Sequence, residues 1–135
     1  MKLFVVPAHM ALKAWSDGAH KLSEATDKAK GEVTTDQLKL LLARGERQLI
    51  GIESAGDVVA WFAVVIDQLP NVRVLYIYAA WAPGSVNAEV FAPLAQFARD
   101  AGASEIRGAS NDAIMRIWRA KLGAEKLYNV FRIGV

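Results

Sequence analysis

The stretch that decides the fold of this chain is Val72-Arg-Val-Leu-Tyr-Ile-Tyr-Ala-Ala-Trp81. Its β-branched and aromatic residues predict a strand. The strand stops at Ala82-Pro83-Gly84-Ser85, where a helical pattern begins. Such a strand–loop–helix junction is a common place for a phosphate-bearing cofactor, because the first helical N–H groups are unpaired and carry partial positive charge. The block Val58–Gly123 contains this stretch, and the two ends of the chain are expected to dock onto it.

The bulk composition fits one domain with one core, residues 1–135. Hydrophobic residues make up 53% and charged residues 22%, so the chain can bury a substantial core and is not disordered. A formal net charge of +2 permits a polyanionic partner without requiring one, and nucleic acid is not indicated. The absence of cysteine excludes disulfides and thiolate metal sites and fits a cytosolic origin.

Neither a signal peptide nor a membrane span is predicted. The apolar run in Met1–Pro7 is too short for a signal peptide. The longest apolar stretch, Val58–Ile66, is far below the roughly 20 residues that cross a bilayer. We therefore expect a soluble, cytoplasmic protein.

Hydrophobic periodicity predicts the order β-α-α-β-β-β-α-β-α-β. The strands are Lys2–Val6, Gln48–Glu53, Val58–Ile66, Arg73–Trp81, Glu105–Ala109 and Lys126–Val135. The first helix is His9–Ala25, the second follows Thr34, the third is Asn87–Ala101, and the last ends before Gly123. Val58–Ile66 is apolar on both faces, which indicates a central strand covered on both sides.

Each helix is expected to bury one apolar face. The predicted inner residues are Leu12, Trp15, Ala19 and Leu22; Leu38, Leu41 and Leu42; Phe91, Leu94, Ala95 and Ala98; and Ile114, Met115, Ile117, Trp118 and Leu122. Turn and cap signals separate the elements: a Thr34–Gln37 capping box, a stop at Gly45, a Ser54–Asp57 hairpin, and Ser110 or Asn111 as the last N-cap.

This element order, with Asn111-Asp112-Ala113 and Trp118-Arg-Ala-Lys-Leu-Gly-Ala124, resembles the GNAT superfamily of acyl-CoA-dependent N-acyltransferases. In that family an Asn after the fifth strand begins a helix that ends Leu-Tyr-x-Lys-x-Gly-Phe, and here Lys121 and Gly123 match. The resemblance covers essentially the whole chain. It implies an α/β fold with a mixed, mostly antiparallel sheet and helices on both faces.

A second resemblance rests on Lys13-Ala14-Trp15 and Leu40-Leu-Leu-Ala-Arg-Gly45. These stretches are similar to segments of short GNAT-like proteins encoded in tailed-phage genomes. That resemblance implies a bacteriophage protein, found in the host cytoplasm or in the virion, with other virion proteins or itself as partner.

The loop after the predicted Arg73–Trp81 strand departs from the GNAT pattern. The family's Arg/Gln-x-x-Gly-x-Gly/Ala loop cradles the CoA pyrophosphate with successive backbone N–H groups, and glycine permits the close approach. Ala82–Glu89 has one glycine, no leading Arg or Gln, and Glu89 in the first helical turn. If the helix starts at Asn87, Pro93 lies in its interior and costs roughly 3 kcal/mol. If Pro93 is instead a first-turn residue, the helix starts late and its N-terminus moves away from the strand end.

The family's catalytic positions are also altered. Its usual general acid, the Tyr of the Leu-Tyr pair, corresponds to Arg119. The usual base is a carboxylate on the fourth or fifth strand, but Val72–Trp81 has none, which leaves Asp67 and Glu105 nearby. Three tyrosines could substitute in proton transfer, and nothing local singles one out: Tyr78, Tyr76 and Tyr128.

The other residues that could take part in catalysis or binding have ordinary structural explanations. His9 and His20 lack clustered partners, so no metal site is predicted. Ser85 and Ser110 lack a nucleophile elbow and a convincing His–Asp partner. Most tryptophans are expected in the core, whereas Trp81 lies at a strand end where this fold opens. The basic residues of the last third are expected on a solvated face, with a polyanion or acidic protein as the alternative.

Two functions remain open from the sequence. The first is a GNAT-like protein, of phage type, that uses no cofactor and serves as a binding or virion-associated structural protein. The second is a divergent acetyl-CoA-dependent N-acetyltransferase. Its CoA site would comprise Trp81, Pro83, Gly84, Ser85, Asn87 and Asn111.

Overall fold

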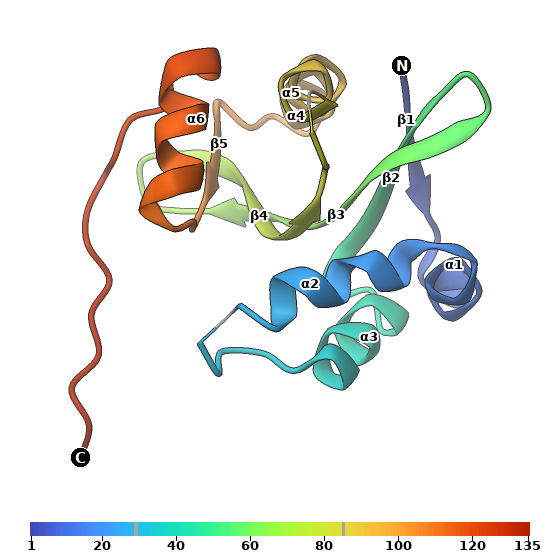
Figure 1. Cartoon of the computed structure of the whole chain (residues 1–135), viewed down its shortest axis with the longest axis horizontal. Coiled ribbons are helices and arrows are strands. Elements are labelled where there is room, and N and C mark those ends of the chain that lie inside the picture. Colours follow the sequence, from blue (N-terminus) through green and yellow to red (C-terminus); the bar gives the residue numbers. More distant parts are fainter. Residues whose placement is uncertain (29, 85) are drawn as a thin grey trace.

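The strands form one mixed sheet whose spatial order follows the sequence (Figure 1). A computed structural model describes residues 1–28, 30–84 and 86–135. Within these residues the strands are β1 (Lys2–Val6), β2 (Gln48–Ser54), β3 (Asp57–Gln68), β4 (Arg73–Trp81) and β5 (Glu105–Gly108). Neighbours from β1 to β4 pair antiparallel, and β4 pairs parallel with β5. The predicted mixed, mostly antiparallel sheet is confirmed.

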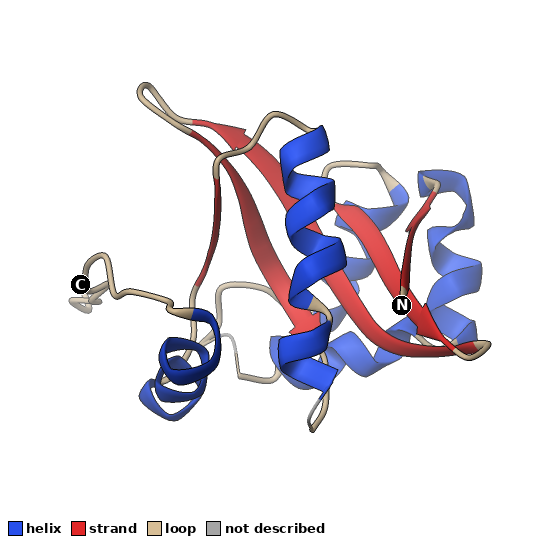
Figure 2. Ribbon diagram, turned by 90° about the horizontal axis from the view of Figure 1, so that it is seen from above, coloured by secondary structure: helices blue, strands red, loops and turns tan. Residues whose placement is uncertain are grey.

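Helices cover both faces of this sheet, as predicted (Figure 2). The helical segments are η1 (Ala8–Met10), α1 (Ala11–Asp17), η2 (Ala19–Leu22), α2 (Ser23–Thr26), α3 (Thr35–Ala43), α4 (Val86–Glu89), α5 (Phe91–Asp100) and α6 (Asp112–Leu122). The segments from η1 to α3 form one layer, and α5 lies on the opposite face. None of the described helices combines the length and the apolar character that spanning a bilayer requires.

Both ends of α3 have the caps that the sequence predicts. Thr34 Oγ1 accepts a hydrogen bond from the Gln37 N–H at 3.2 Å, and Gln37 Oε1 accepts one from the Thr34 N–H at 2.9 Å. Gly45 has φ +75°, and the following N–H of Glu46 donates to the Leu41 carbonyl at 3.0 Å. This is the Schellman arrangement that ends many helices.

The predicted β2–β3 hairpin is confirmed at Ser54–Asp57. Ala55 and Gly56 form its two-residue loop, and both have positive φ, +52° and +86°. Two positive φ values define the type I′ turn, whose twist matches that of the flanking strands.

Two buried clusters fill the molecule, one on each side of the sheet. The cluster under α1–α3 contains Trp15, Leu22, Leu38, Leu42, Leu49 and Trp61. The cluster under α5 contains Ile50, Ile52, Phe62, Val64, Leu75 and Leu94. Because β3 supplies residues to both, the prediction that Val58–Ile66 is central and covered on both faces is confirmed.

The single helix predicted over His9–Ala25 is wrong. Gly18, with φ 170°, separates α1 from the η2–α2 segment. The inward face of α1 also differs from the prediction, because Ala11 is 2% exposed whereas the predicted core residue Leu12 is 57% exposed. The predicted Trp15, Ala19 and Leu22 are buried.

The helix predicted over Asn87–Ala101 is interrupted. It breaks at Val90 into α4 and α5, and Pro93 therefore lies in the first turn of α5. This is the second of the two predicted alternatives for Pro93, and a first-turn proline loses no intrahelical hydrogen bond. Leu94 and Ala98 are buried as predicted, Ala95 is half-buried, and Phe91 is 37% exposed.

The largest correction concerns the C-terminal end. Asn111 caps α6 and Gly123 has φ +68°, as predicted. Of the predicted inner residues, Ile114, Met115, Trp118 and Leu122 are half-buried and Ile117 is 45% exposed, so the predicted face is only partly covered. The strand predicted over Lys126–Val135 is also wrong, because residues 124–135 pair with no described strand and extend away from the sheet (Figure 1).

Candidate functional site

The sheet opens between β4 and β5. These strands pair in parallel from Val74 opposite Glu105 to Ile77 opposite Gly108. Beyond Ile77, β4 continues to Trp81, and its only partner among the described strands there is β3. The edge of β4 from Tyr78 to Trp81 therefore faces an opening at the carboxyl ends of two parallel strands. In α/β sheets that is where ligands bind.

A β-bulge at Tyr78 marks the point where the strands separate. On β3, Ala63 is opposite Ala79 and Val64 is opposite Ile77, so Tyr78 is left without a cross-strand partner. The bulge turns the side chains of both Tyr78 and Ala79 toward the α1–α3 cluster. Bulges of this kind redirect side chains and are common beside active sites.

Arg47 lies against Tyr78. Its guanidinium carbon is 4.7 Å from the centre of the Tyr78 ring, which is a cation–π arrangement. Nη1 donates to the Glu46 carbonyl at 2.8 Å. The buried Nε makes no hydrogen bond with any described residue. Sequence analysis did not identify Arg47, because no local pattern connects residue 47 with residue 78.

Tyr76 interacts electrostatically with both other tyrosines of the chain, Tyr78 and Tyr128. Tyr76 is half-buried, and burial is the main cause that raises the pKa of its phenol above the ordinary value of 10.0. The charge of Glu32 adds to the shift, followed by Tyr128, Asp67 and Tyr78. Tyr76 therefore keeps its proton at neutral pH, so it can donate a hydrogen bond but is not a base.

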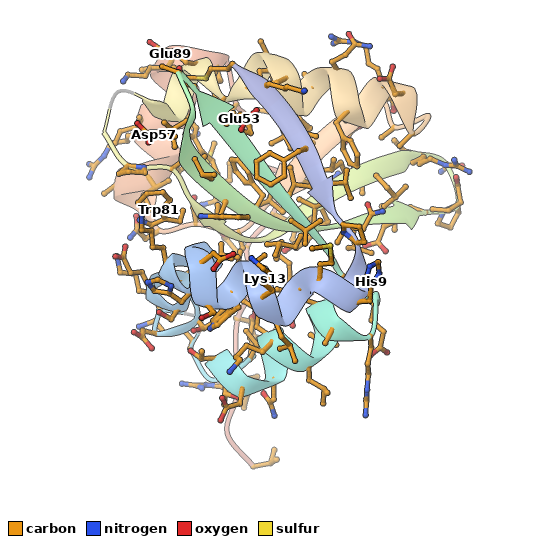
Figure 3. The ribbon with its side chains drawn as sticks, turned by 90° about the vertical axis from the view of Figure 1, so that its right-hand side faces the viewer. His9, Lys13, Glu53, Asp57, Trp81 and Glu89 are labelled. Atoms are coloured by element: carbon orange, nitrogen blue, oxygen red, sulfur yellow. The ribbon has the colours of Figure 1, made fainter. Side chains whose placement is uncertain are left out.

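Trp81 ends β4 beside the helical layer of α1–α3. The Nζ of Lys21 lies 4.3 Å from the centre of the Trp81 ring, a second cation–π contact. Figure 3 shows Trp81 on the side of the sheet that faces these helices. Part of the Trp81 ring is thus already used to join η2 to the strand end. Lys21, like Arg47, was not found from the sequence because the pair is non-local.

The connection from β4 to α5 contains most of the predicted CoA-binding residues. Pro83 and Gly84 are exposed, and Gly84 has φ +62°. Asn87 belongs to the short helix α4. Ser85 lies outside the described residues. Glu89 ends α4 with an exposed side chain, on the α4–α5 side of the sheet in Figure 3.

Asn111 is the N-cap of α6, the helix that follows β5. Its Oδ1 accepts a hydrogen bond from the Ile114 N–H at 2.9 Å. That oxygen therefore serves the helix as an N-cap. Arg119, which occupies the position of the family's tyrosine acid, is exposed on the same helix.

The remaining candidates do not assemble into a site. His20 Nδ1 is 3.1 Å from the Trp15 carbonyl oxygen, and His9 is exposed on η1. Among the described residues, no group of three His, Asp or Glu side chains could hold a metal ion. Asp67 lies near the end of β3, and Glu105 pairs with Arg107 at 2.8 Å.

Comparisons with known proteins define the fold. No family model matches the chain, and no curated protein is similar to it in sequence. Among solved structures, a probable acetyltransferase has a TM-score of 0.68 at 11% identity, over 100% of this chain and 99% of that chain.

Two further solved structures agree. An aminoglycoside acetyltransferase from an uncultured soil metagenomic sample, in complex with sisomicin, has a TM-score of 0.68 at 15% identity, over 99% of this chain and 95% of that chain. A ribosomal-protein-alanine N-acetyltransferase from Brucella melitensis biovar Abortus 2308 has a TM-score of 0.63 at 14% identity, over 100% of each. The chain thus has the fold of GNAT acetyltransferases.

Proposed function

We propose that this chain is a GNAT-fold protein that has lost ordinary acetyl transfer and acts as a binding or virion-associated structural protein of a tailed phage. In this proposal it uses no cofactor. Its partners are proteins, either other virion proteins or a second copy, in the host cytoplasm or the virion.

The connection between β4 and α5 carries this proposal. A pyrophosphate cradle needs several backbone N–H groups that converge on the ligand at a helix N-terminus. Here Pro83 has no N–H, Gly84 is the only glycine, and α4 is a helix of 4 residues. The exposed carboxylate of Glu89 adds a negative charge next to the place where the pyrophosphate would lie.

The proton chemistry of the opening supports the same conclusion. Acetyl transfer from a thioester releases a thiolate, and a thiol has an ordinary pKa near 8.5. Tyr76 has a pKa raised above 10.0, so proton transfer from its phenol to a thiolate is uphill. Arg119, in place of the family's tyrosine, cannot supply a proton at neutral pH.

One observation favours the alternative, a divergent acetyl-CoA-dependent N-acetyltransferase. The β4–β5 opening and the bulge at Tyr78 leave a strand edge available to the amide groups of a CoA arm. In this alternative Trp81, Pro83, Gly84, Ser85, Asn87 and Asn111 hold the cofactor. Tyr78 would transfer the proton.

Titration calorimetry with acetyl-CoA and with CoA tests the proposal. We expect no heat of binding at millimolar ligand. Micromolar affinity, about −8 kcal/mol, would overturn the proposal and favour the enzyme. Glu89→Gln isolates the effect of the carboxylate. Asp100→Asn is its matched control, because it removes the same charge at the C-terminal end of α5, whereas Glu89 lies in α4, before α5 begins.

An activity measurement complements the titration. Arg119→Tyr restores the aromatic acid that the resemblance implies. We expect this variant to gain no acetyl-CoA hydrolysis or amine acetylation, because the phosphate cradle is still missing. A gain in either reaction would show that the opening binds acyl-CoA after all.

A further inference from the structure

The charge of the chain is divided unevenly between its C-terminal end and the rest. We call residues 111–135, which comprise α6 with its N-cap and the extended tail, the C-terminal arm. The arm contains five Lys or Arg and two Asp or Glu, a net side-chain charge of +3. Residues 1–110 contain eleven Lys or Arg and twelve Asp or Glu, a net side-chain charge of −1. The positive charge of the whole chain therefore resides in the arm.

The cations of the arm are exposed and have no anionic partner. They are Arg116, Arg119, Lys121, Lys126 and Arg132. Among the residues that the structure describes, the ion pairs join Lys13 to Asp17 and Arg107 to Glu105, and none involves the arm. Because its charges are not neutralised within the chain, the arm carries a positive potential that attracts an anionic partner.

The same segment exposes large apolar side chains. The exposed fractions are 45% for Ile117, 50% for Leu127, 70% for Tyr128, 81% for Val130, 80% for Phe131 and 76% for Ile133. An exposed apolar patch of this size marks an interaction site. The partner of the arm must therefore accept apolar and aromatic side chains as well as cations.

The apolar side chains of the tail lie on both of its faces. Tyr128 and Val130 occupy even positions, whereas Leu127 and Phe131 occupy odd positions, and successive side chains of an extended chain point to opposite faces. The edge of a sheet or a groove on a protein covers one of these faces and leaves the other in water. The headgroup region of a bilayer surrounds the segment on both faces and still provides water for its backbone N–H and C=O groups.

The arm is placed where a flat surface can reach it. Figures 1 and 2 show α6 and the tail at one end of the molecule, opposite the end that contains β1. A bilayer can therefore contact the arm without touching the α1–α3 layer. Tyr, Lys and Arg suit such a contact, because their apolar stems or rings lie among the lipids while their polar ends remain at the surface.

We propose that the C-terminal arm binds the surface of a bilayer that contains anionic lipids. Residues 127–133 lie in the headgroup region, and the five cations of the arm face the anionic headgroups. The arm lies on the bilayer and does not span it. This inference goes beyond the proposed function, because it depends on α6 and the tail and not on the connection between β4 and α5.

Co-sedimentation of the full chain with vesicles tests this binding. One set of vesicles contains phosphatidylcholine alone, and the other contains equal amounts of phosphatidylcholine and phosphatidylserine. We expect the protein to sediment with the mixed vesicles and not with phosphatidylcholine alone. Added NaCl should weaken the binding, because salt screens the attraction between the cations and the anionic headgroups. No binding to the mixed vesicles, or equal binding to both sets, would overturn the proposal.

A charge variant tests the contribution of the arm's cations. Arg116→Gln combined with Lys121→Gln should weaken binding to the mixed vesicles about tenfold or more, the scale expected for two cations at an anionic surface. The matched control, Lys13→Gln combined with Arg44→Gln, removes the same charge from α1 and from the end of α3 and should leave binding unchanged. Equal weakening by the two pairs would contradict a specific role of the arm.

An apolar variant tests insertion of the tail. Phe131→Ser should weaken vesicle binding about tenfold, the scale of losing one buried aromatic side chain. Leu12→Ser, at a side chain that is 57% exposed on α1, is its control and should have no effect. Because both side chains are exposed, neither change disturbs the core. A Phe131→Ser variant that binds vesicles as tightly as the wild type would refute insertion.

Polyglutamate distinguishes the bilayer from an acidic protein. We expect the chain to bind polyglutamate more weakly than the mixed vesicles, because polyglutamate offers no apolar region. Equal binding to both, unaffected by Phe131→Ser, would overturn the proposal and assign the arm to an acidic protein. None of these results bears on CoA binding, so a failure of this inference can be told apart from a failure of the proposed function.

Discussion

The first hundred residues and the last thirty form two regions of different character. From β1 to Ala103 the chain buries residues on both faces of the sheet, including Leu38, Ile50, Ile52 and Leu75 at 0% exposure. From Ser104 to Val135 no residue is buried. Yet the second region has comparable apolar residues in α6 and in the tail. The difference shows that an amphipathic pattern buries its apolar face only where a neighbouring element is available to cover it.

The largest expected difference between the two regions is in the loss of stability when an apolar side chain is truncated. Leu75→Ala removes a fully buried side chain from the α5 cluster and should lower the free energy of unfolding by about 2–5 kcal/mol. Leu127→Ala, in a tail residue that is 50% exposed, should change it by less than about 0.5 kcal/mol when the protein is dilute and monomeric. Urea unfolding of both variants measures the contrast. Equal losses would contradict the division into two regions.

The next effect concerns the tight contact between β1 and β2. A Cβ on Gly51 would lie 2.2 Å from the Phe4 ring. That ring also makes an edge-to-face contact with Trp61, at 5.8 Å between centroids. Gly51→Ala should therefore destabilise the first region by about 1–3 kcal/mol through overpacking.

The control for this contact is Gly134→Ala in the tail, where an added Cβ meets nothing within 4 Å. Thermal unfolding should show a lower midpoint for Gly51→Ala and no change for the control. An unchanged midpoint in Gly51→Ala would mean that β1 moves away from β2 without cost.

The two regions also contain a matched pair of helix caps. Thr34 accepts from the Gln37 N–H at 3.2 Å, and Asn111 accepts from the Ile114 N–H at 2.9 Å. Thr34→Ala should lower global stability by about 1 kcal/mol, because α3 packs against the core. Asn111→Ala should fray α6 locally without moving the main unfolding transition.

Hydrogen exchange distinguishes these outcomes. Faster exchange confined to α6 in Asn111→Ala is expected. A global loss of stability in that variant would show that α6 belongs to the cooperative core.

The smallest expected effect is a dependence on alkaline pH. The pKa of Tyr76 is raised in the folded state, mainly by burial, so the folded protein holds this proton more tightly than the unfolded chain. The contribution is fully present below the unfolded value of about 10 and is lost as the pH rises through the folded pKa. Tyr76→Phe should flatten this loss of stability at alkaline pH. Urea unfolding at several alkaline pH values measures the loss, and an equally steep loss in Tyr76→Phe would contradict the prediction.

Several features were predictable because their causes are local. The Thr34–Gln37 capping box, the left-handed Gly45 and the Ser54–Asp57 hairpin each depend on residues within a few positions of one another. The β4 strand, Arg73–Trp81, agrees with its predicted bounds because β-branched and aromatic residues fill it.

The errors came from features without a local cause. The predicted first helix breaks at Gly18, which packs beside Trp61 of β3, so that an added Cβ would lie 3.4 Å from its indole nitrogen. The contacts of Arg47 with Tyr78 and of Lys21 with Trp81 join residues far apart in the sequence. No periodicity in the sequence could have found either pair.

The sequence by itself determined the strands β1 to β5, the central position of β3 and the altered loop after β4, because hydrophobic period, turn chemistry and the lack of glycines are properties of neighbouring residues. Only the tertiary structure decided where β4 and β5 separate, which residues meet at Tyr76, and that residues 126–135 have no strand partner within one copy. The physical reason is that a strand forms only where a neighbouring strand has a free edge to pair with. Whether such an edge is available depends on the whole fold and not on the residues of the segment itself.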